Sequence, residues 1–222
     1  MTWMPGQGCV AAVEAVDITG AWLTVTAAGA MHVMHVSDEA SEFLAELELT
    51  LGEGPSLDVH DSAGPVLARD LASAEAAGRW PGFAAAACQA GARAVFAFPL
   101  HTGATRMGVL GLYRDRPGPL NAVQIGTALL LADTMTLLLL ESLGAAAGDC
   151  TALAGPVQGQ MPGLTLHRAE IDQATGMLTV QLGTGVSEAF ARLRAYSFSQ
   201  DRRIADVARE IITRRLRLQP DP

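Results

Sequence analysis

The stretch EIDQATGMLTVQLGTGVSEAFARLRAYSFSQDRRIADVAREIITRRLRL, from Glu170 to Leu218, contains three short amphipathic segments in succession. In the first, apolar residues recur three or four positions apart, which is the spacing of one helix face. Two glycines, Gly183 and Gly185, follow and are expected to end that helix. The second segment is expected to begin at Ser187, a favourable N-cap residue. The third is expected to follow Ser199 to Asp201.

Each segment has one apolar face, and these faces predict a shared core. The apolar positions are, in order, Ile171, Ala174, Met177, Leu178 and Leu182, then Phe190 and Leu193, then Ile204, Val207, Ala208, Ile211 and Ile212. Helices this short cannot bury an apolar face alone. The sequence therefore predicts a C-terminal, all-α bundle of three helices.

The distribution of charge divides the chain into two parts. All 15 basic residues are arginine, and Met161 to Pro222 holds 9 of them against 7 acidic residues. Met1 to Gln160 holds 6 arginines against 16 acidic residues. An acidic region followed by a small basic helical region favours a sensor joined to a module that contacts phosphate. A charged outer face is, however, also what any solvated helix shows.

Three fragments of the bundle carry a resemblance to a known family. They are QATGML (Gln173 to Leu178), SEAFARLRAYS (Ser187 to Ser197) and DVAREII (Asp206 to Ile212). In this order and spacing they resemble the ANTAR domain, a three-helix RNA-binding module of bacterial transcription antiterminators. The resemblance implies that this region binds hairpins in nascent transcripts. One departure is Thr175, where many members have lysine.

Arginine suits RNA recognition because its planar guanidinium both stacks on unpaired bases and holds phosphate with two hydrogen bonds. Phe190 and Leu193 fix the buried side of the second helix, so we expect the recognition surface beside them. The candidate RNA-binding residues are Gln173, Thr175, Arg192, Arg194, Tyr196, Arg202, Arg203 and Arg209. We expect Gln173 and Thr175 at the edge of that surface. Three further arginines, Arg214, Arg215 and Arg217, are expected in a solvated C-terminal turn.

The preceding region mixes helical and extended patterns without regular parallel βαβ spacing, which predicts an α+β fold with helices on an antiparallel sheet. The expected helices are Cys9 to Ile18, a helix capped by Ser37, a helix from Pro81 to near Gly91, and Asn121 to Leu143. The expected strands are Trp22 to Thr26, Met31 to Val36, Val66 to Arg69, Ala94 to Leu100 and Gly108 to Tyr113. The segment from Leu51 to Pro65 is expected to be a loop, because glycine and proline punctuate it.

This region resembles a GAF domain, a sensor fold often placed ahead of output modules. The fragments that carry the resemblance are GEGPSLD (Gly52 to Asp58), FPL (Phe98 to Leu100) and GVLGLY (Gly108 to Tyr113). Together the two resemblances suggest an actinobacterial protein that combines both domains. We expect a GAF-like domain over residues 8–145, a linker over 146–163 and an ANTAR-like domain over 164–220.

The GAF resemblance implies either a small-molecule sensor or a dimerisation scaffold. A ligand pocket would lie between the sheet and the segment from Gly52 to His60. Its candidate residues are Trp22, His32, Trp80, Phe83 and Tyr113, with His35 as a further possibility, although such residues also fill cores. His32 and His35 are three apart on a strand, so we expect them on opposite faces and predict no shared metal.

The sequence gives little support for enzyme chemistry. Cys9, Cys88 and Cys150 lack the spacing of a metal or redox motif. Some GAF domains reduce free methionine sulfoxide with cysteines, which makes such a reductase the enzymatic alternative. In this chain Ser56 stands in the loop, at a position where the matching actinobacterial proteins commonly have cysteine. We therefore predict a protein without catalytic activity, metal or cofactor.

A cytoplasmic protein that forms a homodimer fits the remaining features. The N-terminus has no signal-peptide pattern, and the apolar run from Ile125 to Leu140 is short and interrupted by Asp133. The leucines of the helix from Asn121 to Leu143 exceed one apolar stripe, so a second copy is expected to cover part of it. The alternative to RNA binding is a module that contacts a partner protein, which the net charge of −8 favours.

Overall fold

The computed structural model describes residues 5–27, 30–62, 64–103, 105–147, 166–200 and 202–219. The chain forms two compact units, Met1–Leu164 and Thr165–Pro222. Each unit has its own hydrophobic core. Most of the expected linker, residues 146–163, lies outside the described residues.

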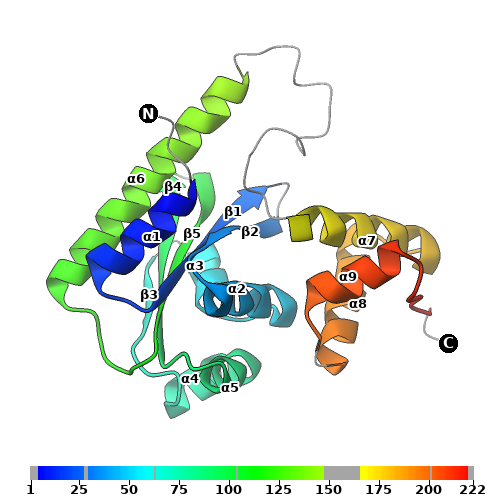
Figure 1. Cartoon of the computed structure of the whole chain (residues 1–222), viewed down its shortest axis with the longest axis horizontal. Coiled ribbons are helices and arrows are strands. Elements are labelled where there is room, and N and C mark those ends of the chain that lie inside the picture. Colours follow the sequence, from blue (N-terminus) through cyan, green and yellow to red (C-terminus); the bar gives the residue numbers. More distant parts are fainter. Residues whose placement is uncertain are drawn as a thin grey trace. The chain divides into compact units, whose positions relative to one another are not determined.

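The first unit is built on a sheet of five strands, which are β1 (Gly20–Ala27), β2 (Ala30–Val36), β3 (Val66–Ala68), β4 (Ala94–Thr102) and β5 (Thr105–Arg114). Their order is β2-β1-β5-β4-β3 (Figure 1). Every neighbouring pair is antiparallel. The antiparallel sheet predicted from the sequence is therefore confirmed.

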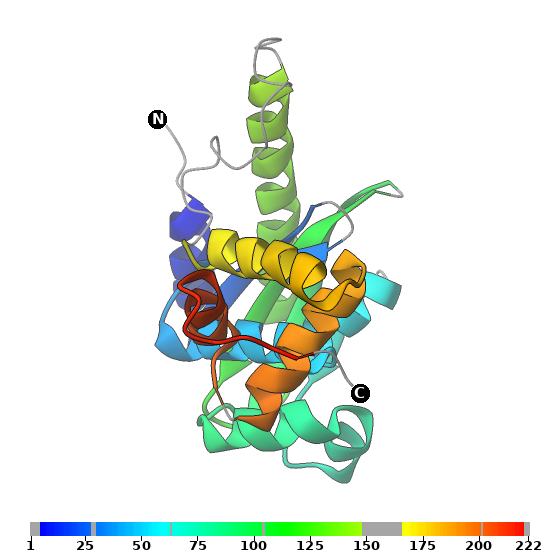
Figure 2. The same cartoon turned by 90° about the vertical axis from the view of Figure 1, so that its right-hand side faces the viewer.

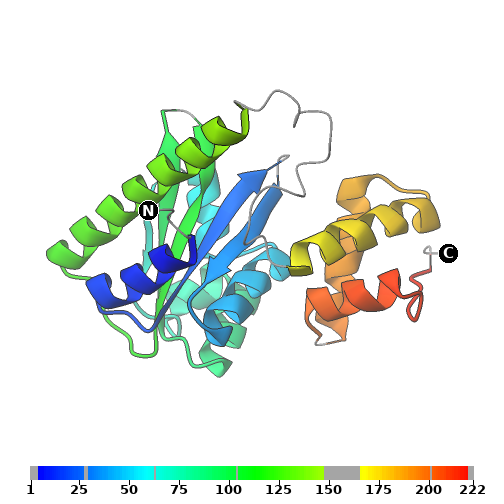
Figure 3. The same cartoon turned by 45° about the horizontal axis from the view of Figure 1, so that its top comes forward.

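One face of this sheet is covered by α1 (Pro5–Val16) and α6 (Ala122–Ala147), which pack against each other and the strands (Figure 3). The buried side chains of this layer include Cys9, Leu23, Phe96, Phe98, Leu110, Leu112, Ala128, Ala132 and Met135. Among the described residues, α6 is the one helix that length and composition would allow to cross a membrane. One side of α6 packs into the core of the unit through Ala128, Ala132 and Met135.

The opposite face carries α2 (Glu39–Leu51), α3 (Pro55–Ser62), α4 (Ala74–Arg79) and α5 (Pro81–Gln89). Four aromatic side chains lie in the core of this layer, namely Trp22, Trp80, Phe83 and Tyr113. The Trp80 and Phe83 rings meet edge to face, with centroids 6.4 Å apart.

The segment expected to be a loop between α2 and β3 contains the helix α3, so that expectation is wrong. Pro55 takes the first helical position, where its missing N–H costs nothing. The next N–H, of Ser56, is satisfied by the Oε1 atom of Glu48 at 2.8 Å. This acceptor lies eight residues earlier on α2, so no local capping pattern announces the helix. The short helix α4 was likewise not predicted.

The N-cap of α2 is Asp38 rather than the expected Ser37. Asp38 accepts the Ser41 N–H at 2.8 Å through Oδ1. Ser37 instead accepts the Ala21 N–H at 2.8 Å and donates its own hydroxyl to Asp38. The cap is therefore tied to β1 through this serine, and the phenol of Tyr113 also donates to Asp38 at 3.3 Å.

A β-bulge changes the expected orientation of the two histidines on β2. The register between β1 and β2 shifts between Leu23 and Thr24, so that His35 pairs with Leu23 and His32 pairs with Val25. Residues that pair across strands lie on the same face, and Leu23 and Val25 both belong to the α1–α6 layer. Both histidines therefore lie on that face, and the expectation of opposite faces is wrong.

The second unit is a bundle of α7 (Leu166–Leu182), α8 (Val186–Ser199) and α9 (Ile204–Ile212), which pack on one another (Figure 2). Its buried core is Ala174, Leu178, Ala189, Leu193, Ile204, Val207, Ala208 and Ile211. The predicted apolar faces and the three-helix bundle are thus confirmed. Gly183, with a φ of 68°, ends α7 as expected.

One helix start in the bundle differs from the sequence-based expectation, and the other agrees with it. The N-cap of α8 is Gly185, one residue before the helix begins at Val186, rather than Ser187. The N-cap of α9 is Arg203, whose φ of −62° and ψ of 135° are extended. Neither cap residue supplies a side-chain hydrogen bond. The start of α8 was misplaced because Ser187 was taken as the capping residue, whereas α9 follows Ser199 to Asp201 as expected.

The packing of Trp22 on Gly111 gives a prediction for stability. A Cβ added at Gly111 would overlap the Trp22 indole, so Gly111→Ala should destabilise the first unit by about 1–3 kcal/mol or more. Gly78→Ala on α4, where a Cβ meets nothing within 4 Å, is the matched control and should be neutral or slightly stabilising. Urea unfolding followed by tryptophan fluorescence reports this unit alone, because all three tryptophans precede residue 81. Equal midpoints for the two variants would contradict the packing.

Candidate functional site

Three of the arginines predicted to contact RNA are paired with carboxylates inside the bundle. The guanidinium of Arg202 donates two hydrogen bonds of 2.8 and 3.0 Å to the Glu210 carboxylate. These bonds to Arg202 lower the pKa of Glu210. The other pairs join Arg209 to Glu170 at 3.1 Å and to Asp206 at 3.4 Å, and Arg192 to Glu188 at 3.9 Å. Part of the positive charge expected from the sequence is therefore neutralised within the bundle.

The remaining predicted cations and the tyrosine are partly buried. The guanidinium of Arg194 lies 5.7 Å from the centroid of the Phe190 ring, and burial lowers the pKa of Arg194. Arg203 is half-buried at the start of α9. Tyr196 is half-buried and packs on the bundle core. These residues occupy α8 and the turn into α9, as the sequence predicted, but each has a structural role as well.

The two residues expected at the edge of the surface lie in different surroundings. Thr175 is only 6% exposed, and its hydroxyl donates to the Ile171 carbonyl at 2.7 Å. The expectation that Thr175 contributes to a surface is therefore wrong, because its position on α7 faces the other helices. Gln173 is exposed and lies on a different part of α7.

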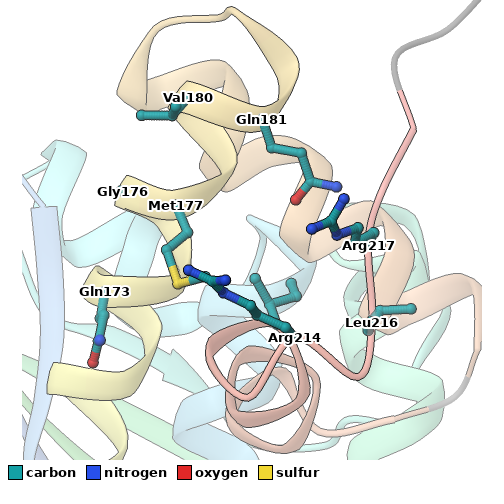
Figure 4. Close-up of a pocket in the computed structure, with 9 residues that line it drawn as sticks. Gln173, Gly176, Met177, Val180, Gln181, Arg214, Leu216 and Arg217 are labelled. Carbon is teal, nitrogen blue, oxygen red and sulfur yellow. The ribbon is translucent and has the colours of Figure 1, made fainter.

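Gln173 lines an open groove between α7 and the segment after α9, with a volume of about 620 Å³ (Figure 4). Polar groups come from Gln173, Gln181, Arg214 and Arg217, and apolar ones from Met177, Val180, Ile211 and Leu216. The sequence analysis placed the two arginines in a solvated turn and missed the groove. The available signal was the spacing of Gln173, Met177, Val180 and Gln181 along one outer side of α7.

Two backbone features bring the C-terminal segment back beside α7. Arg214 adopts a left-handed conformation with a φ of 59°, which turns the chain directly after α9. The Gln181 side chain then donates to the Leu218 carbonyl at 2.6 Å. Leu216 and Leu218 also pack on the bundle core. The segment is thus held in place by both a hydrogen bond and apolar contacts.

Four of the five residues proposed to line a ligand pocket share one buried layer of the first unit, and His32 lies apart from them. Trp22, Trp80, Phe83 and Tyr113 are buried in the α2–α5 layer, whereas His32 pairs with Val25 on the other face. The polar tips of the aromatic residues are satisfied within the protein. The Trp22 indole N–H donates to the Ser56 hydroxyl at 3.3 Å, and the Trp80 indole N–H donates to Asp58 at 3.1 Å. The Tyr113 hydroxyl donates to Asp38 at 3.3 Å. In this structure the four rings therefore act as core residues.

A buried carboxyl group in the same layer was not identified from the sequence. Glu48 is 1% exposed, and its Oε2 atom has no hydrogen-bond partner in the part of the chain that the structure describes. Burial raises the pKa of Glu48 to about 7, although the hydrogen bond from Ser56 N opposes that shift. This acid connects α2, α3 and, through Ser56, Trp22 of β1.

The cysteines and histidines do not assemble into a reactive centre among the described residues. Burial raises the pKa of Cys9 to about 12, so its thiol is protonated at neutral pH, and it donates weakly to the His35 carbonyl at 3.9 Å. Cys88 is a half-buried free thiol on α5. Cys150 lies outside the described residues. Within the described ranges, no group of three potential metal ligands was found.

Family models match both units. A model of the GAF domain matches residues 7–139, and a model of the ANTAR domain matches residues 165–212. These matches confirm the pair of resemblances inferred from the sequence fragments. No curated protein sequence matches the chain.

Two solved GAF domains are similar to this chain in fold. The GAF domain of a phosphoenolpyruvate-protein phosphotransferase from Coxiella burnetii has a TM-score of 0.52 and 16% identity, covering 64% of this chain and 83% of that one. GAF3 of a protein from Synechocystis sp. PCC6803, in its photoproduct state, has a TM-score of 0.51 and 14% identity, covering 64% and 95%. At these identities the likeness shows the fold alone.

Glu48 gives a prediction for the pH dependence of stability. Because its pKa rises from 4.5 to about 7 on folding, its protonated form favours the folded state. This contribution is complete below pH 4.5 and is lost as the pH rises through about 7. Relative to Glu48→Gln, which cannot ionise, the wild type should lose on the order of 2–3 kcal/mol of unfolding free energy between pH 5 and pH 8.

The measurement is urea unfolding of both proteins at the two pH values, followed by tryptophan fluorescence. The control is Glu39→Gln, an exposed position in the first turn of the same helix. The difference in unfolding free energy between Glu39→Gln and the wild type should be equal at both pH values. If the difference in unfolding free energy between the wild type and Glu48→Gln also stays constant, Glu48 does not titrate between pH 5 and pH 8.

Proposed function

Because this chain belongs to the GAF domain family and carries an ANTAR domain over residues 165–212, we propose that it is an RNA-binding regulator of transcription antitermination. The ANTAR domain would bind hairpins in nascent transcripts. The GAF domain would sense a small molecule or hold two copies together. The observation that carries this proposal is that the ANTAR match spans the self-contained α7–α9 bundle, which is the basic part of the chain.

The proposed contact surface consists of Arg192, Arg194, Tyr196, Arg202, Arg203 and Arg209, and Gln173 lies apart from it in the groove. The internal ion pairs of Arg192, Arg202 and Arg209 do not prevent this role. An exposed ion pair is worth about 0–1 kcal/mol, so an RNA phosphate can replace the carboxylate at small cost. Guanidinium groups also hold phosphate with two parallel hydrogen bonds, as Arg202 holds Glu210.

We propose that the chain is a cytoplasmic, non-catalytic homodimer. Apolar side chains on the outer side of α6 remain exposed, among them Val123, Leu129, Leu130, Leu137 and Leu140. A second copy of the same helix would cover such a stripe. The high pKa of Cys9 and the serine at position 56 speak against the sulfoxide-reductase alternative. A protein-interaction module without RNA binding remains the second candidate, favoured by the net charge of −8.

RNA binding is tested by ultraviolet crosslinking in the native cell, followed by sequencing of the RNA that co-purifies with the full chain. We expect enrichment of stem–loop sequences. Binding of an enriched stem–loop should weaken with Arg209→Gln, and the salt dependence should flatten by a little under one unit because one phosphate contact is lost. Arg69→Gln removes the same charge from an exposed site in the GAF domain and should change neither value. Absence of RNA enrichment would leave the protein-partner alternative.

Dimerisation is tested by light scattering of the full chain at tens of micromolar. The wild type should have twice the mass of the 23.1 kDa chain. Leu137→Glu should give a monomer, because this side chain is 62% exposed on α6 and a buried carboxylate would oppose association. The control Leu67→Glu alters an exposed leucine on β3 and should remain dimeric. A monomeric wild type would exclude the proposed dimer.

A further inference from the structure

The groove beside α7 is formed partly by residues beyond the ANTAR match, which ends at residue 212. Arg214, Leu216 and Arg217 belong to the segment that turns back after α9. Figure 4 shows both arginine side chains extending from this segment towards α7. The groove is therefore a feature of this chain's own C-terminal segment together with the outer side of α7.

Among the described residues, the lining of the groove carries a positive charge. None of its lining residues is acidic. Within the part of the chain that the structure describes, neither Arg214 nor Arg217 has a carboxylate partner. This distinguishes them from Arg202 and Arg209, whose guanidinium groups are paired inside the bundle. An anion in the groove would meet two arginines without displacing an internal partner.

The shape and the apolar lining suit a flat ring attached to that anion. A volume of about 620 Å³ lies within the range of about 300–1,000 Å³ for small-molecule sites. Val180 is 85% exposed although apolar, and it lies on the α7 side of the groove with Met177. The Gln173 amide supplies a donor and an acceptor on the same helix, whereas the Gln181 amide donates to the Leu218 carbonyl. This combination of cation, apolar surface and amide matches the parts of a nucleotide.

We propose that this groove binds an unpaired nucleotide of the target RNA. Arg214 and Arg217 hold its phosphate, and its base lies against Val180 and Met177 within reach of the Gln173 amide. This rests on the proposed function, and it adds a contact site outside the surface formed by α8 and the start of α9. Unpaired nucleotides are the ones whose base faces are open to such a site, whereas the bases of a duplex are stacked on each other.

The test compares binding of two RNAs to the full chain. One is the stem–loop enriched by crosslinking, and the other is the same stem as a blunt duplex without unpaired nucleotides. Val180→Glu places a carboxylate in the groove at an exposed position, so the fold should be unaffected. Its matched control is Val186→Glu, which is 67% exposed on α8 and lies outside the groove. Thermal unfolding of each variant checks that the bundle remains folded.

We expect Val180→Glu to weaken stem–loop binding by on the order of 10-fold, because the added carboxylate would lie beside the bound phosphate, and to have much less effect on the duplex. Val186→Glu should change the affinities for the stem–loop and for the duplex by less than about 2-fold. Arg217→Gln should flatten the salt dependence for the stem–loop by a little under one unit. Arg215→Gln removes the same charge two residues earlier, outside the groove, and should leave the slope nearly unchanged.

The outcomes separate this inference from the function on which it rests. If the wild type binds the stem–loop and Val180→Glu behaves like Val186→Glu, the groove proposal is overturned while RNA binding stands. Equal losses on the stem–loop and the duplex would also overturn it, because the unpaired nucleotide would then play no part. If the wild type binds no enriched RNA, both proposals fail. If Val180→Glu no longer binds a protein partner but keeps its affinity for the stem–loop, the groove binds that partner instead.

Discussion

The fully buried indole of Trp22 is the contact on which the GAF domain depends. Its ring occupies the space left by the absent side chain of Gly111 on the neighbouring strand β5. The indole N–H donates to Ser56, and the Ser56 N–H is bound by Glu48, so one side chain links the sheet to both α2 and α3. A ligand on this face would have to displace that ring or bind outside it. Sensing by this domain therefore requires either rearrangement of the α2–α5 layer or a site away from the rings.

The sheet needs cover on both faces, and this requirement shapes α6. The helix is apolar around most of its circumference, but the sheet and α1 bury only one side, which includes Ala128 and Met135. Leu130 and Leu137 remain on the outside. Burial of apolar area is worth about 25 cal/mol per Å², so a second copy would gain stability by covering them. Dimerisation through α6 and RNA binding through α7–α9 use different units, and either proposal can hold without the other.

Periodicity explains what the sequence predicted well. The bundle and its core follow from the spacing of apolar residues along single helices, and the antiparallel sheet follows from the lack of regular βαβ spacing; both were confirmed. The errors arose where distant residues decide the structure. Helix α3 depends on Glu48 eight residues before Ser56, and the bulge on β2 depends on its pairing with β1. The groove depends on the chain reversal at Arg214. Thr175 was misplaced because many members of the resembling family have lysine at this position, which suggested a surface site, whereas Thr175 is buried on α7.

The local charges of the bundle, rather than the net charge of −8, govern its approach to RNA, because charges farther apart than about 8 Å are largely screened at physiological ionic strength. Within the bundle the arginines are not equivalent. A phosphate that binds Arg202 or Arg209 displaces a glutamate, which is then left unpaired beside the RNA and repels it. A phosphate that binds Arg214 or Arg217 displaces no internal carboxylate among the described residues. Each arginine of the groove should therefore contribute more to binding than each ion-paired arginine, even though the paired ones lie within the family match.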